Sequence, residues 1–231
     1  MKKIKNELFP VLASTFACIA LAGCGSAGGA AAAAAEPASQ VEPGLELLSV
    51  EGVEPVYPNM IANGGFEEWT EGMAAPVGFG LPDPRHSQVV MEEAQKAEGV
   101  RAAKQVWTED DGIASFYKKL NVVQRNLNLQ AQYTLRLSAA NPSQNTVVIT
   151  VADVDVTGAP HSDGSYPIAN TKNVITIEPR TAMTEYTAAI TPGLPGGAVI
   201  ICTGIVGGLK EPGGAVIWDN WDLRLTSPKA D

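Results

Sequence analysis

The 231-residue chain has few of the residues from which most catalytic and metal sites are built. It contains two histidines, three cysteines and 6% aromatic residues. With only His86 and His161 present, there is little material for a histidine metal site or for a general base beside a nucleophile. Basic residues are also scarce, with 16 Lys and Arg against 25 Asp and Glu and a net charge of −9. This composition argues against a nucleic-acid partner, which would require a basic surface.

The first 23 residues have the pattern of a secretory signal peptide. Lysines at positions 2, 3 and 5 precede an apolar run from about Leu8 to Gly23. That run contains Pro10, and it falls short of comfortably spanning a bilayer, which takes ~20 apolar residues. Residues 1–23 hold three lysines and one glutamate, so the remainder carries a charge of −11 rather than −9. We predict that residues 1–23 are removed on export.

Leu21, Ala22 and Gly23 stand directly before Cys24, and this stretch resembles the lipobox of bacterial lipoproteins. The resemblance implies a diacylglyceryl group on the sulfur of Cys24, which becomes the first mature residue. An ordinary cleaved signal with a cysteine nearby by chance is the alternative. Two or more acyl chains on one residue give stable anchoring. We therefore expect a lipid-anchored protein of the cell envelope. Gly25 is not the aspartate of an inner-membrane retention signal, which favours the outer membrane.

Residues 24–45 are predicted to be a low-complexity tether. They include six consecutive alanines from Ala30 to Ala35, and such a stretch buries too little apolar surface to fold. The third cysteine, Cys202, lies in an apolar run and is best read as a small buried hydrophobe. A catalytic thiol is the alternative for Cys202. With Cys18 in the signal and Cys24 acylated, no intrachain disulfide is expected.

Residues 46–227 are predicted to form one β-sandwich domain. Period-two alternation marks strands around residues 133–139, 147–151 and 185–190, and further apolar or β-branched runs lie at 174–177, 198–202 and 214–226. Turn clusters such as Asn141-Pro142-Ser143 separate these runs. The segment Met91 to Ala97 is the best helical candidate, with an extended edge as its alternative. Short strands punctuated this regularly favour a sandwich or barrel.

Several motifs in this domain resemble carbohydrate-binding modules of the family 4/9/22 type. Residues 59–69 read NMIANGGFEEW and residues 216–223 read VIWDNWDL, similar to the opening and closing motifs of that family. Between them, GVRA at 99–102, YKKLNV at 117–122 and YTLRLS at 133–138 occur in the family's order. The resemblance implies an all-β jelly roll of the galactose-binding-like type, and it implies glycan binding without catalysis.

The same resemblance implies a structural calcium ion held by Glu67 and Asp219. Hard oxygen ligands, including backbone carbonyls, suit calcium. From alternation alone, Ile217, Asp219, Trp221, Leu223 and Leu225 should share one face of the last strand. A carboxylate among those core residues must then be paired, hydrogen-bonded or metal-bound. An arginine partner or a solvated strand end is the alternative for Asp219.

Sugar binding calls for exposed aromatic faces with polar groups beside them. We assign Trp221, Phe66 and Tyr133 to the core, because large aromatics contribute most to it. The exposed candidates are Trp107, Trp69, Tyr117 and Tyr166. Trp107 is the strongest of these, because it stands beside a polar turn and shares a strand face with two polar candidates, Gln105 and Arg101.

Catalysis finds less support. Glu67 with Glu68, or Glu109 with Asp110 and Asp111, could be paired carboxylates for glycoside hydrolysis, but adjacent acids in a loop are more often solvated turns. A metal cluster formed by Asp153, Asp155, His161 and Asp163 is a further alternative to a polar strand end.

We therefore expect a non-catalytic, lipid-anchored envelope protein whose jelly roll binds a polysaccharide or envelope glycan. The alternative is the same fold used as a structural or interaction module that docks an envelope protein. An exposed aromatic strip on the concave sheet would favour glycan binding. Small or aliphatic residues there would favour the interaction module.

Overall fold

The computed structural model describes residues 57–70, 75–109 and 116–228. The predicted signal peptide, Cys24 and the tether lie outside these ranges, as do Asp110 and Asp111. In the described residues no helix is long and apolar enough to cross a membrane. The elements are β1 (Ser87–Glu92), β2 (Ala102–Trp107), the 3-10 turn η1 (Phe116–Lys118), β3 (Asn121–Gln124), β4 (Ala131–Asn141), β5 (Thr146–Val154), β6 (Ile168–Ile177), β7 (Thr181–Ile190), β8 (Val199–Val206) and β9 (Ala215–Pro228).

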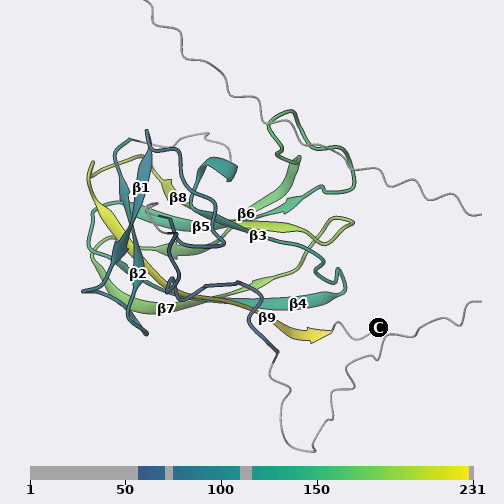
Figure 1. The fold of residues 1–231 in the computed structure, drawn as a ribbon, viewed down its shortest axis with the longest axis horizontal. Helices are drawn as coiled ribbons and strands as arrows, with labels where there is room; N and C mark the ends of the chain where they lie inside the picture. Colours follow the sequence, from purple (N-terminus) through teal and green to yellow (C-terminus); the bar gives the residue numbers. More distant parts are fainter. Residues whose placement is uncertain (1–56, 71–74, 110–115, 229–231) are drawn as a thin grey trace, which may run out of the picture. The chain divides into compact units, whose positions relative to one another are not determined.

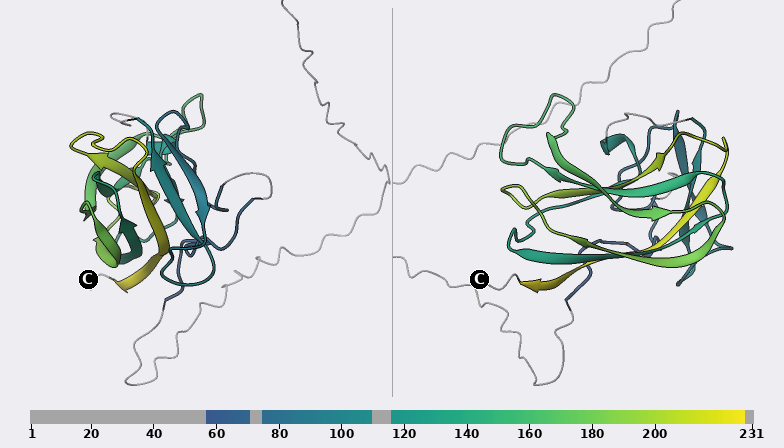
Figure 2. Two further views of the ribbon diagram at one scale, coloured as in Figure 1. Left: turned by 90° about the vertical axis from the view of Figure 1, so that its left-hand side faces the viewer. Right: turned by 180° about the vertical axis from the view of Figure 1, so that it is seen from behind.

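Two antiparallel sheets pack face to face in a jelly-roll β-sandwich (Figure 1). One sheet has five strands in the order β1-β2-β9-β4-β7, and the other has four in the order β3-β8-β5-β6. Figure 2 shows the two layers from the side and from behind. The all-β class and the sandwich predicted from strand spacing are confirmed. The strands predicted around residues 133–139, 147–151 and 185–190 correspond to β4, β5 and β7.

The core lies between the sheets and holds most of the aromatic side chains. Trp218 and Trp221 meet edge to face with their ring centroids 5.9 Å apart. Phe66 packs against Phe79 at 4.6 Å. Trp221 and Phe66 are fully buried and Tyr133 is 4% exposed, so their assignment to the core is confirmed. Such aromatic pairs add to the stabilisation that comes from buried area.

The helix considered for Met91 to Ala97 does not form. Met91 and Glu92 end β1, and the residues after them are an irregular loop that leads to β2. The carboxylate Oε1 of Glu92 accepts the backbone N–H of Ala94 at 2.8 Å. A side chain that bonds nearby backbone in this way offers that backbone an alternative to the helix. The extended-edge alternative is correct for the first two residues.

The alternation expected in β9 is interrupted by a β-bulge. Arg136 of β4 faces Asp222, whereas Ser138 faces Asp219, so one extra β9 residue lies between the two pairs. Asn220 has a positive φ of 50°, a conformation that Asn tolerates better than most residues. The bulge lets Trp218 and Trp221 both enter the core, while Ile217, Asp219 and Asp222 face outward. The prediction that Asp219 and Trp221 share a face is therefore wrong.

Candidate ligand-binding surfaces

The inward side of β2 carries Trp107, Gln105 and Ala103, so the predicted stacking platform is part of the core. Trp107 is 1% exposed and Gln105 is also 1% exposed. The Nε2 of Gln105 donates to Ser87 Oγ at 3.0 Å, and its Oε1 accepts the indole N–H of Trp218. β2 lies between β1 and β9, with one face against the opposite sheet. Trp107 and Gln105 share a face as predicted, but that face is buried, and their assignment to a ligand site is wrong.

Arg101 and Trp69 are held by backbone carbonyls in the opening segment. The Nη1 of Arg101 donates to the carbonyl of Glu67 at 2.8 Å. The indole Nε1 of Trp69 donates to the carbonyl of Phe66, and the half-buried ring packs against the main core. Both side chains therefore brace the opening motif, and neither lies with Trp107 on an exposed platform.

Tyr117 and Tyr166 are the two predicted aromatics that the structure brings together. The backbone N–H of Tyr166 donates to the Tyr117 hydroxyl at 3.3 Å. The guanidinium of Arg125 lies 5.4 Å from the centroid of the Tyr166 ring, within the range of a cation–π contact. Both tyrosines are half-buried on a small apolar cluster that contains Val154 and Ile200, on the outward face of the four-stranded sheet. A ligand role for this pair stays a prediction.

Glu67 and Asp219 both bind the loop between β1 and β2. Asp219 is fully buried, and its Oδ2 accepts the backbone N–H groups of Ala97 at 2.7 Å and Glu98 at 3.0 Å. The Oε1 of Glu67 accepts the N–H of Val100 at 2.8 Å. Thus each carboxylate, one from each end of the domain, holds the same short loop.

Burial raises the pKa of Asp219, and the charge of Glu67 adds to the rise, while backbone hydrogen bonds from Glu98, Ala97 and Asn220 oppose it. In the described residues, no three His, Cys, Asp or Glu side chains come together as a metal site. Calcium at Glu67 and Asp219 would therefore depend on backbone carbonyls for its other ligands. The amide donors that surround both carboxylates already satisfy part of their hydrogen-bonding capacity. Calcium binding stays a prediction.

The acids considered for catalysis or for a metal cluster are dispersed. Asp155 accepts a hydrogen bond from the Thr157 hydroxyl, and Asp163 accepts one from the Ser165 hydroxyl, each in a local turn. Asp153 faces the space between the sheets and accepts the Asn170 side chain at 2.7 Å. Glu109 lies 4.0 Å from His86. Within the described part of the chain the four-residue cluster is not assembled as a metal site. The pairing of Glu109 with Asp110 and Asp111 lies outside the described residues.

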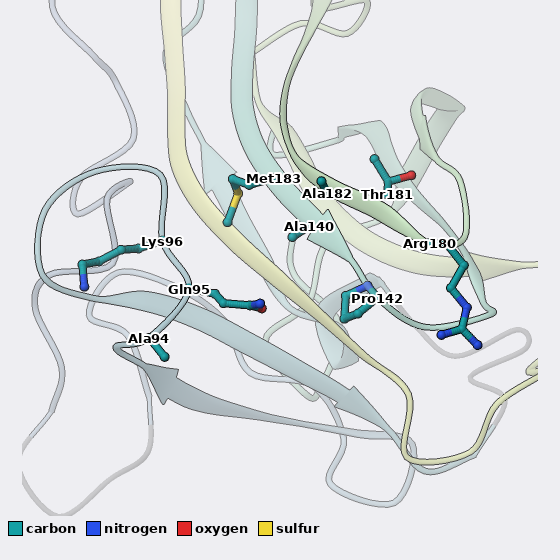
Figure 3. Close-up of a pocket in the computed structure, with 9 residues that line it drawn as sticks. All are labelled: Ala94, Gln95, Lys96, Ala140, Pro142, Arg180, Thr181, Ala182 and Met183. Atoms are coloured by element: carbon teal, nitrogen blue, oxygen red, sulfur yellow. The ribbon is translucent and has the colours of Figure 1, made fainter.

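The outward face of the five-stranded sheet is hollowed in two places, which sequence reasoning did not single out. One hollow, of about 600 Å³, lies between the loop after β1 and the ends of β4 and β7 (Figure 3). Its floor includes Ala140 and Met183, while Lys96 points away and donates to the carbonyl of Glu93. The second, of about 310 Å³, is mainly polar and has Arg136, Glu185 and Arg224 on its walls.

Polar and charged groups alternate across this outward face. Arg136 stands opposite Asp222 of β9, and Glu185 of β7 stands opposite Ser138. The Nε of Arg224 donates to both oxygens of Asp222, at 2.9 and 2.8 Å. Trp221 is the one aromatic residue that lines either hollow, and its side chain is fully buried. The face can therefore form hydrogen bonds but offers no stacking platform among the described residues.

Solved structures resemble this chain, whereas no family model and no curated protein matches it. The tandem CBM22 domain of Paenibacillus barcinonensis Xyn10C matches with a TM-score of 0.50 and 9% identity, covering 75% of this chain and 48% of that one. The chain thus spans about half the length of that tandem structure. A candidate sugar-binding protein from Bacteroides thetaiotaomicron matches with a TM-score of 0.50 and 12% identity, covering 73% of this chain and 100% of that one.

An enzyme is similar to the same extent. A Stig cyclase from Fischerella sp. TAU, solved with a pyrrolidinylidene-indole ligand, has a TM-score of 0.50 and 14% identity, covering 76% of this chain and 100% of that one. At such identities the likenesses show the fold alone, because unrelated activities share common folds. The jelly roll implied by the sequence motifs is confirmed.

Proposed function

We propose that this protein is a non-catalytic glycan-binding module, held at the cell envelope by a lipid on Cys24. The fold it shares with carbohydrate-binding modules supports this proposal. The lipobox-like sequence before Cys24 supports export and anchoring. If the predicted tether of about twenty residues behaves as a random coil, it would reach roughly 25 Å, which would let the domain stand off the membrane.

The observation that carries the proposal is the polar hollow on the outward face of the five-stranded sheet. Arg136, Glu185 and Arg224 present both donors and acceptors there, and a sugar hydroxyl is both a donor and an acceptor. The alternation of charge sign suits a neutral polyhydroxylated chain better than an ion. We infer that glycan binding on this face depends on hydrogen bonds.

The second candidate function is an interaction module that docks an envelope protein. Ala102, Ala140 and Ile217 are buried on the same outward face, and Met183 packs against them. A floor of small and aliphatic residues without an aromatic strip favours this candidate. The two candidates predict different ligands for the same face, so binding measurements separate them.

The test is affinity electrophoresis and calorimetry of the purified protein with a panel of soluble polysaccharides: xylan, mixed-linkage β-glucan, galactomannan and pectin. Arg136→Ala should weaken binding by about tenfold or more, because a hydrogen bond to a charged group contributes about 1.5–3 kcal/mol. Arg125→Ala is the matched control, since it removes an arginine that directly follows β3 of the other sheet.

A loss of affinity confined to Arg125→Ala would contradict glycan binding on the outward face of the five-stranded sheet. The site would then lie at Tyr117 and Tyr166, beside Arg125. If both variants bind with the affinity of the parent protein, neither arginine contacts the glycan, and the site on the outward face is contradicted. If no polysaccharide binds at millimolar sugar concentrations, the glycan proposal fails and the interaction module replaces it.

A further inference from the structure

A third hollow, of about 400 Å³, opens between the two sheets beside β6 and β7. These strands follow one another in sequence but are edge strands of different sheets, so a hollow lined by residues of both lies at the edge of the sandwich. Its apolar wall includes Val151 and Ile190, which are also members of the main core cluster. The hollow therefore ends at the core and admits only a small group or the end of a chain.

An inward-facing carboxylate lies in this hollow. Asp153 of β5 pairs with Val199 of β8, a core residue, and is 6% exposed. Its Oδ2 accepts the Asn170 side-chain amide at 2.7 Å, and its Oδ1 accepts the Gly193 backbone N–H at 3.0 Å. An ionised carboxylate has about four acceptor positions. Two neutral donors thus leave capacity for a further donor from a ligand.

The backbone around Asp153 is specialised to hold it in place. Asn170 has a positive φ of 49°, at a point where the β5–β6 register is irregular. A Cβ at Gly193 would lie 2.6 Å from Asp153 Oδ2 and 3.1 Å from Asn170 Nδ2. Only glycine allows the loop after β7 to approach this closely. Uncommon backbone geometry that converges on a polar group supports a functional role for that group.

The remaining polar groups of the hollow give it mixed hydrogen-bonding character. Lys172 and Gln132 line it together with Asp153, and Lys172 is exposed. The ion pairs within the described residues do not include Asp153. The hollow therefore combines an acceptor carboxylate, a lysine donor and an amide with apolar walls. Ligand sites commonly have this composition, and a volume near the lower end of their usual range of roughly 300–1,000 Å³ suits a small group.

We propose that this hollow, the β6–β7 cleft, binds the terminal sugar residue of a glycan, with neighbouring hydroxyls donating to Asp153 and accepting from Lys172. This inference rests on the proposed glycan function and gives it a second site. A glycan chain could lie along the outward face, whereas the β6–β7 cleft ends at the core and takes only the end of a glycan chain.

The test is a titration of the isotope-labelled protein with D-glucose, D-galactose, D-mannose and D-xylose, followed by amide NMR. A cleft for a single ring should bind at least one of them in the millimolar range and shift the amides of Asn170 and Gly193. Asp153→Asn should weaken that binding by about tenfold or more, since one charged acceptor is lost. Asp155→Asn is the matched control, because Asp155 lies in a local turn with Thr157.

Lys172→Gln provides a second variant, at an exposed position where a substitution leaves the core intact, and it should also reduce affinity. If polysaccharides bind but no monosaccharide shifts the Asn170 and Gly193 amides or competes with the polysaccharide, the cleft proposal is overturned and the proposed function stands. Equal affinity in Asp153→Asn and in the parent protein would overturn it as well. Failure of both polysaccharides and monosaccharides to bind would remove the proposed function and the cleft together.

Discussion

The indole N–H of Trp218 donates to the side-chain oxygen of Gln105 across a 3.1 Å hydrogen bond inside the core. Both side chains are almost fully buried. Because buried polar groups need partners, the amide of Gln105 serves the indole of β9 and the hydroxyl of Ser87 and not a ligand. β2 is therefore joined to β9 by a side-chain bond as well as by its backbone.

Trp107→Ala should lower the stability of the protein and leave its ligand affinity unchanged. A fully buried tryptophan lost from a core costs about 3–5 kcal/mol. Urea denaturation measures the loss, with Trp69→Ala, a half-buried residue, as the comparison that should lose less. A Trp107→Ala protein of normal stability but weakened polysaccharide binding would contradict the buried placement.

Gly99→Ala should loosen the loop between β1 and β2. Gly99 has a φ of +63°, and a Cβ there would lie 1.7 Å from Glu67 Oε1. The left-handed backbone alone costs roughly 1–2 kcal/mol for a residue with a side chain, and the clash would also displace Glu67 from Val100. Gly158→Ala is the control, because nothing lies within 4 Å of its Cβ position. Equal urea midpoints for the two variants would contradict this account.

Calcium should raise the melting temperature if Glu67 and Asp219 hold the ion. An ion that binds only the folded state stabilises by about 2.7 kcal/mol at one hundred times its dissociation constant. Asp219→Ala should abolish that calcium dependence, whereas Asp222→Ala, on the same strand, should keep it. If the melting curves with chelator and with added calcium match, no calcium is bound there, and the loop amides are the partners of Asp219.

Cys24→Ala should leave an unprocessed, unacylated precursor, because the cysteine sulfur is the predicted site of lipid attachment. Mass spectrometry of the mature N-terminus measures the acyl mass. Cys18→Ala is the matched control and should still be acylated, since Cys18 lies within the predicted signal peptide. An N-terminus that begins elsewhere without a lipid would show an ordinary cleaved signal.

The sequence was sufficient for β4, β5, β7, β8 and β9. It did not single out β1 or β3, and it did not show which side of the sheet each residue faces. Alternation correctly put Trp107 and Gln105 on one face of β2. Which face is buried depends on the neighbours of β2, and the partner strand β9 lies more than a hundred residues away in sequence. The polar turn after Trp107 suggested exposure, but a strand can be buried up to its last residue.

The bulge in β9 could not be derived from alternation, although the spacing of Trp218 and Trp221 was a signal for it. Two tryptophans three residues apart cannot share a face of a regular strand. The pairing of Tyr117 with Tyr166 also escaped prediction, because it depends on how two distant loops fold over β5 and β8. The hollow at Asp153 escaped for the same reason, since its donors come from β6 and from the loop after β7.

The extra residue at position 220 makes β9 sensitive to length. Substitutions at Asn220 need only tolerate its backbone conformation. If the bulge were lost with every residue kept, strict alternation from Trp218 onward would turn Leu223 and Leu225 to the solvent side and Asp222 and Arg224 inward. The extra residue is therefore what lets both halves of the closing strand face the same core, and a one-residue insertion after the bulge would do more damage than most substitutions in that strand.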